Sequence, residues 1–383
     1  MMSFIQTLHQ ELKTIFSDIA IVLTVVGGVL LYSFLYPQPY INESVSKVKV
    51  SVVDNDKTDM SRDLLFMLGS TPQLAITQEY LSEKEAKEAL LDSKVQGLIV
   101  IPKDFKKDTL QHKQPVIAIG ADSSYFLIFG GVVEGAMKSI LTTGASLKVA
   151  NLLKNNTPLV GAKMGFTPYS LEQINLFNKN NSYTQYVIPA VFVLILQQTM
   201  LIGLGIFGGG INERAYKNYN YETNTLYVML SRYIIFVTLF FIHLLFYFGF
   251  SFSFFGITHL ASIPDLIAFS FLFLSATLFF GIFIGALFSS REIATPAVLF
   301  SSLALVFSAG FVWPLEALPS WLVVFSNFFP STPAIEGFLK LNQMGAEMQM
   351  VLKNALILFA QAFFYAILGY YLLNKKRKNL GKI

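Results

Sequence analysis

The chain has 383 residues, of which 54% are hydrophobic and only 14% charged, and it contains 37 Phe and no Cys. A soluble domain of this length carries about a quarter charged residues, so the composition is that of a membrane protein. The net charge of +4 lies largely in the basic tail, residues 375–383, and does not indicate nucleic-acid binding. The absence of cysteine excludes disulfides and thiolate metal sites.

Residues 1–18 are predicted to form an amphipathic helix that lies along the inner membrane surface. Apolar side chains recur at helical spacing on one face, and polar side chains lie opposite. The apolar residues are Phe4, Ile5, Leu8, Leu12, Ile15 and Phe16, and the polar residues are Gln6, His9, Gln10, Glu11 and Lys13. The alternative is a simple cytoplasmic extension of the first span, but the apolar face favours the interfacial helix.

Six windows are long and apolar enough to cross a bilayer, which takes about 18 or more apolar residues. They are Ile19–Tyr36, Val187–Phe207, Tyr233–Phe255, Leu266–Phe288, Ile293–Val312 and Ala355–Leu373. The first window resembles a signal peptide, but it is longer than the usual apolar core and no small-x-small cleavage site follows it. We therefore interpret residues 19–36 as a retained transmembrane helix, and residues 186–374 as the other five spans.

Lys and Arg in the short loops set the orientation of the spans. The tail is rich in them, Arg214 and Lys217 follow the second span, and Arg291 lies between the fourth and fifth spans. This pattern predicts that both termini are cytoplasmic. The predicted fold class is an α-helical integral membrane protein with six transmembrane helices, multi-pass in the inner (cytoplasmic) membrane.

Residues 37–185 are predicted to form a soluble domain outside the cytoplasm. Segments typical of strands alternate with segments typical of helices, which indicates a mixed α/β domain inserted between the first two spans. One of the helices begins with Ser82, and Glu85 three residues later completes a predicted capping box.

A short acidic run follows the first predicted strand and resembles the start of a calcium loop. It contains Asp54, Asp56 and Thr58, but Asp59 stands where glycine is needed and Leu65 where a bidentate glutamate is needed. Turn and helix-cap chemistry is therefore expected, with no metal site.

The stretch from residue 310 to residue 345 is apolar enough to enter a bilayer, yet it is broken repeatedly. The interrupting residues are Pro314, Glu316, Pro319, Pro330, Pro333 and Glu336. Proline lacks an N–H and clashes with the preceding helical turn, so the prolines are expected to interrupt any helix in this stretch. Trp313 and Trp321 suit a membrane interface. The alternative is a loose amphipathic surface loop.

The chain has no G-x-x-x-x-G-K-[ST] phosphate loop and cannot hydrolyse ATP by that route. His243 is the only ionisable side chain well inside a predicted span, and a lone histidine is more often a contact between helices than a proton carrier. No nucleophile and base are visible at membrane depth, so an intramembrane enzyme is disfavoured. Gln197, Gln198 and His243 are candidate residues of a substrate pathway. If the chain moves a substrate, the energy must come from another subunit.

Over nearly its whole length the chain resembles an ABC transporter permease of the type-2 exporter family. The order is that of the family: an amphipathic N-terminal helix, one span, a large outer domain and five more spans. The stretch SAGFVWPLEALPSWLVVFSNFFPSTPAIEGFLKLNQMGA is similar to the family's Gly…Pro-x-x-x-x-Pro-x-W…Pro…Pro…Gly pattern. VSVVDND and VQGLIVIPKDF resemble the outer domain of the branch that works with a periplasmic adaptor.

The resemblance implies roles for two segments. Residues 313–345 would form a re-entrant hairpin, an outer gate that includes Pro314, Glu316, Pro319, Trp321, Pro330 and Pro333. The loop after the second span would dock on the ATPase together with the N-terminal helix, through Glu213, Arg214, Lys217 and Glu222. Many relatives have Gly-Thr and Leu in this loop; Thr225 and Leu226 are present here but the Gly is absent, so the register of the coupling helix stays open.

The predicted function is therefore the permease subunit of an ATP-driven exporter, itself not an enzyme and without a cofactor, because ATP would be bound by a partner subunit. The implied partners are an ABC ATP-binding subunit, a second permease copy or a paralogue, a periplasmic membrane-fusion adaptor and membrane lipids, with no nucleic acid. The alternative is a non-transporting membrane scaffold that presents its outer domain to cell-envelope partners. The sequence leaves the substrate open.

Overall fold

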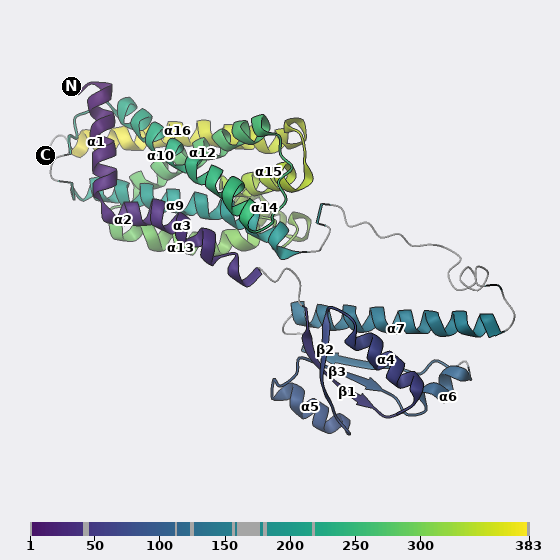
Figure 1. Cartoon of the computed structure of the whole chain (residues 1–383). Coiled ribbons are helices and arrows are strands. Elements are labelled where there is room, and N and C mark those ends of the chain that lie inside the picture. Colours follow the sequence, from purple (N-terminus) through teal and green to yellow (C-terminus); the bar gives the residue numbers. More distant parts are fainter. Residues whose placement is uncertain are drawn as a thin grey trace. The chain divides into compact units, whose positions relative to one another are not determined.

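A computed structural model describes residues 2–40, 46–111, 113–122, 126–154, 158, 177–178, 182–216 and 219–380. The chain divides into two compact units. The helical unit comprises Met1–Glu43 with Asn175–Ile383, and the α/β unit comprises Ser44–Ile174. Figure 1 shows both chain termini at one end of the helical unit, with α14 and α15 at its other end.

Six helices in the described residues are long and apolar enough to cross a membrane, which confirms the number predicted from hydropathy. They are Ile19–Tyr40, Tyr183–Asn212, Thr225–Phe254, Ile263–Leu287, Arg291–Ser308 and Met348–Leu380. Each is built around a regular helix or helices, in order α2 (Ile19–Val22) and α3 (Val29–Leu35), α9 (Val187–Asn212), α10 (Thr225–Leu245), α12 (Ile263–Leu287), α13 (Arg291–Ser308) and α16 (Leu352–Leu380). Two of them contain a π-helical turn, η1 (Leu23–Gly28) and η4 (Phe246–Ser251).

Helix α9 lies at the centre of the helical unit and is buried over nearly its whole length. It is apolar on all sides, as expected of a helix surrounded by others. Its glycine-rich end allows backbone to approach backbone: a Cβ at Gly208 would lie 2.4 Å from the carbonyl oxygen of Gly285, and one at Gly209 would lie 2.4 Å from that of Ser290. The end of α9 is therefore fitted closely to the turn between α12 and α13.

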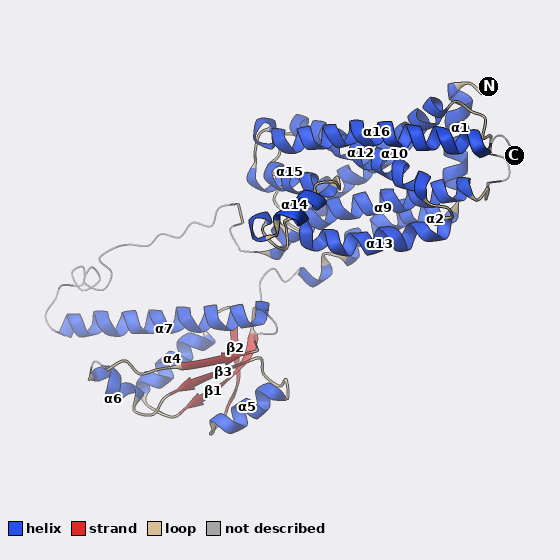
Figure 2. Ribbon diagram, turned by 180° about the vertical axis from the view of Figure 1, so that it is seen from behind, coloured by secondary structure: helices blue, strands red, loops and turns tan. Residues whose placement is uncertain are grey.

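The α/β unit is built on one four-stranded mixed sheet of order β2-β1-β3-β4. Strand β1 (Val48–Asp54) pairs in parallel with β2 (Leu74–Glu79) and β3 (Gly97–Ile101), and β4 (Ala118–Ala121) is antiparallel to β3. Helices α4 (Asp59–Gly69) and α7 (Phe126–Lys154) cover one face, while α5 (Glu83–Leu91) packs on the other (Figure 2). A short helix, α6 (Phe105–Leu110), follows β3. The mixed sheet predicted from sequence is confirmed.

The acidic run after β1 is used in turn and cap contacts. The Asp54 carboxylate accepts hydrogen bonds from the backbone N–H groups of Asp56 and Lys57 and from the Ser61 hydroxyl, and Thr58 caps α4. Among the described residues, no group of three His, Cys, Asp or Glu side chains is placed to hold a metal ion.

The proline-rich stretch forms three short helical pieces: η5 (Leu315–Ala317), α14 (Ser320–Ser326) and α15 (Ser331–Met344). Pro314, Pro319 and Pro330 each stand immediately before one of them. Each piece therefore begins at a proline, whose missing N–H costs nothing in the first turn. Pro319 also follows Leu318, the C-cap of η5, so it separates two pieces as well as beginning the second. Gly345, in the left-handed region at φ 64°, ends α15.

Candidate functional site

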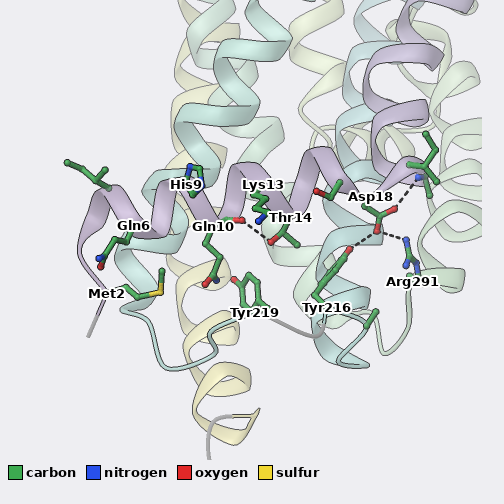
Figure 3. Close-up of a pocket in the computed structure, with 15 residues that line it drawn as sticks. Met2, Gln6, His9, Gln10, Lys13, Thr14, Asp18, Tyr216, Tyr219 and Arg291 are labelled. Carbon is green, nitrogen blue, oxygen red and sulfur yellow. Dashed lines mark hydrogen bonds and ion pairs between the residues drawn. The ribbon is translucent and has the colours of Figure 1, made fainter.

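An open groove lies at the end of the helical unit that carries both termini (Figure 3). Its walls are α1 (Phe4–Ser17) and the 213–224 loop, which joins α9 to α10. The groove has a volume of about 1110 Å³, and its polar lining includes Gln6, His9, Gln10, Lys13, Asp18, Tyr216, Tyr219 and Arg291. Apolar side chains, among them Met2, Ile5 and Ile19, line it as well. An open groove of this size with a mixed lining suits a protein surface rather than a small buried ligand.

Helix α1 begins with a capping box at Ser3 and is amphipathic. Its apolar side chains Leu12 and Phe16 are exposed, and Ile5, which is also exposed, lines the groove. Glu11, which the sequence places opposite the apolar residues, is fully buried. Helix α1 therefore presents one face to the groove, one apolar face outward, and a third face, which includes Glu11, to α10.

Glu11 is held by an arginine and a tyrosine. Arg232 of α10 donates from Nε to the Glu11 carboxylate at 2.9 Å, with side chains 3% and 0% exposed. The Tyr219 hydroxyl donates to the same carboxylate. Burial raises the pKa of Tyr219 well above its usual range, and the Glu11 charge raises it further, so the phenol remains a donor. Breaking such a buried pair by removing one partner costs about 3–5 kcal/mol.

Asp18, at the corner between α1 and α2, forms a second cluster of a carboxylate with an arginine and a tyrosine. One carboxylate oxygen accepts from the backbone N–H of Ala20 and caps α2. The other accepts from Arg291, the first residue of α13, at 2.5 Å and from the Tyr216 hydroxyl at 2.9 Å (Figure 3). This pair is less enclosed than the first, because the Arg291 side chain is 34% exposed.

The 213–224 loop is fixed by α16 as well. Arg377 donates to the carbonyl oxygens of Tyr221 and Thr223 at 2.9 and 3.0 Å, and to the Tyr219 hydroxyl at 3.1 Å. Arg377 is 3% exposed although it belongs to the basic tail of the sequence. Side chains from α1 and α16 thus hold the described residues of this loop in place.

The four residues predicted for docking lie in or beside this loop. Glu213, Arg214 and Glu222 are exposed, and Arg214 donates to the carbonyl oxygen of Leu380 at 2.5 Å. Lys217 lies outside the described residues. The exposed side chains are available to a partner at the edge of the groove.

At the other end of the helical unit, the turn between α14 and α15 is pinned to two spans. Gln197 of α9 accepts from the Ser331 backbone N–H at 2.5 Å and donates to the Ser331 hydroxyl at 3.0 Å. Gln361 and Tyr365 of α16 donate to the carbonyl oxygens of Asn327 and Phe328 at 2.6 and 2.8 Å. Gln197 thus caps the first turn of α15, whose N–H groups have no partner within the helix.

Other side chains of this segment are partly exposed. Trp313 and Trp321 are 57% and 70% exposed. Glu336 is paired with Lys340 at 2.6 Å and accepts from Asn354 at 2.9 Å. Burial opposes the charged form of Glu336, but these two partners outweigh it, and the net effect lowers the pKa of the carboxyl. Glu336 is therefore ionised at neutral pH.

A second cavity, of about 490 Å³, lies between the first span, α9 and α13. It is mostly apolar, with polar side chains from Thr24, Gln198 and Ser302. Of the three candidate pathway residues, Gln198 lines it, whereas Gln197 and His243 do not belong to its lining. His243 is 5% exposed and lies edge-on to the ring of Phe240, with centroids 5.4 Å apart.

The six long apolar helices define a multi-span membrane protein, and an α/β unit belongs to the same chain. The chain belongs to the ABC-2 family of transporter proteins, whose family model matches residues 19–371. Its members are the membrane components of ABC transporters. No curated protein matches the chain.

Proposed function

We propose that this chain is the permease subunit of an ATP-driven exporter and that a separate ATP-binding subunit docks in the groove between α1 and the 213–224 loop. The observation that carries the proposal is the groove itself: it is open, lined by polar and apolar side chains, and bound to three spans through Arg232, Arg291 and Arg377. A displacement of the groove by the partner would be transmitted to the spans through these polar contacts. ATP would be bound by the partner.

Docking is tested by reversing charge on the groove. Lys13→Glu on α1, combined with Arg214→Glu on the loop, should weaken co-purification of the ATP-binding subunit at least tenfold and abolish its stimulation in liposomes. Both side chains lie at the groove or its edge and their replacement leaves no buried charge unpaired. The matched control is Lys353→Glu, an exposed lysine at the opposite end of α16. If the double variant still stimulates ATP hydrolysis by the ATP-binding subunit, the groove is not the docking site. If the native protein binds that subunit without stimulating it, the result favours a non-transporting scaffold.

The proposed orientation places this groove and both termini in the cytoplasm and the α/β unit outside. Cysteines introduced at Lys84 and Lys378, both exposed, should be labelled from opposite sides of the membrane by an impermeant thiol reagent. The chain has no cysteine of its own, so the signal is unambiguous. Labelling of both positions from the outside would contradict the orientation.

The proposed path runs past the cavity beside Gln198 and ends at the α14–α15 segment, which would act as the outer gate. The cavity supports a lipophilic substrate, since its lining is mostly apolar. A second copy of the chain or a paralogue would complete the path. The α/β unit would serve a periplasmic adaptor, in line with the branch that the sequence resembles.

A further inference from the structure

Two carboxylates of the N-terminal segment, seven residues apart, are bound in the same way. Glu11 binds Arg232 of α10 and Tyr219 of the 213–224 loop. Asp18 binds Arg291 of α13 and Tyr216 of the same loop. We call each carboxylate, together with its arginine and tyrosine, a joint. Each joint connects the N-terminal segment to one span and to the wall of the groove at the same time.

The two joints differ in how easily they can open. The Glu11–Arg232 pair is closed to solvent, at 0% and 3% exposure, and the Arg232 guanidinium also stacks 4.6 Å from the centre of the Phe207 ring. Separating it would strand two charges in the protein interior. The Asp18–Arg291 pair has solvent access, since the arginine is 34% exposed, so water can solvate the guanidinium once it leaves the carboxylate.

The solvent-accessible Asp18–Arg291 joint lies at the base of one wall of the cavity. Arg291 is the first residue of α13, and the same helix contributes Leu299, Ser302, Leu303 and Val306 to the cavity lining. On the other side of the joint, Asp18 caps α2, the first helix of the first span, and that span forms the facing wall of the cavity. The Asp18–Arg291 contact thus links the two walls at their base.

We propose that α1 acts as a lever in which the Glu11 joint is a fixed pivot and the Asp18–Arg291 joint is a latch. A partner seated in the groove contacts Tyr216 and α1 together, draws Asp18 away from Arg291, and lets α13 move relative to the first span. The identity of that partner rests on the proposed function; the pivot and the latch do not.

The latch can be tested on the chain by itself. Asp18→Asn keeps an oxygen for the Ala20 N–H and puts its NH2 group where it can donate to the Tyr216 hydroxyl, but it removes the charge and the acceptor oxygen that hold Arg291. Spin labels at Phe16 and Phe300 report across the latch, and labels at Leu12 and Leu230 report across the pivot; all four side chains are exposed. In lipid nanodiscs, with labelled protein diluted in unlabelled protein, the variant should at least double the width of the first distance distribution and leave the second unchanged. Broadening of both, or of neither, would overturn the lever.

The second measurement uses the complex with the ATP-binding subunit. Cysteines at Asp18 and Arg291, joined by a reducible thiol cross-linker, should retain the bound subunit but lose its stimulated ATP hydrolysis, and reductant should restore it. The control pair, Leu12→Cys/Phe16→Cys, links two positions on one helix and should lose nothing. Full stimulation in the linked protein would overturn the latch, and so would a linked protein that no longer binds the subunit. Failure of the native chain to bind any ATP-binding subunit would instead count against the proposed function and leave the distance measurement standing.

Discussion

Replacing Glu11 with alanine should destabilise the helical unit by about 3–5 kcal/mol, because it breaks a buried ion pair by removing one partner. The substitution leaves the Arg232 guanidinium buried without its counter-charge, and it removes the acceptor of the Tyr219 hydroxyl. Unfolding in detergent, followed by the loss of tertiary signal with increasing denaturant, measures the change. Protein abundance in the membrane should fall with it, since a loss of this size is a large part of total stability.

The matched control replaces both partners. Glu11→Met/Arg232→Met fills the same space without charge and should recover most of the lost stability, because a buried pair exchanged for apolar side chains of similar volume is often neutral. The recovery would be incomplete, as Tyr219 keeps Arg377 but loses its acceptor. If Glu11→Ala unfolds like the native protein, the ion pair is not buried in the membrane-embedded protein and the fixed pivot falls with it.

The spans and the α/β unit could be predicted because their signals are local. A transmembrane helix must be apolar along its own length, and a strand or helix of the α/β unit carries its own periodicity. The π-helical turns in the first and third spans had no such signal. The number of spans was therefore within reach of the sequence, and the finer course of each helix was not.

The joints of α1 could not be predicted, since they depend on pairing across the chain. Periodicity separates a polar face from an apolar one, but it does not say which part of the polar face another helix will cover. Glu11 meets Arg232, which lies 221 residues away, and Asp18 meets Arg291, 273 residues away. Arg377 is a similar case: within a run of lysines it looks like part of a solvated tail, yet it turns inward to bind loop carbonyls. A clue was present in the seven-residue spacing of the two carboxylates, which puts them on one side of a helical path.

Replacing Gln197 with leucine should detach the α14–α15 turn from α9. The change leaves the Ser331 N–H and hydroxyl buried without partners, at a cost of about 1–3 kcal/mol for each group. The first turn of α15 loses its cap, so its amides should exchange with solvent at least tenfold faster. Hydrogen exchange read by mass spectrometry over residues 331–344, together with the unfolding temperature in detergent, measures both effects.

The neighbouring residue supplies the control for this prediction. Gln198 carries the same side chain one position along α9, but it lines the cavity and its amide nitrogen has no protein partner among the described residues. Gln198→Leu should therefore leave exchange in α15 and the unfolding temperature unchanged, although both variants add the same apolar side chain to the same helix. If the α14–α15 segment is the proposed outer gate, Gln197→Leu should also uncouple ATP hydrolysis from export of a lipophilic fluorescent dye in the complex, because a loose turn would no longer close the outer end of the proposed path. Equal exchange in the two variants would mean that the Gln197–Ser331 contact does not hold the turn, and the α14–α15 segment would then lack the fixed anchor that a gate requires.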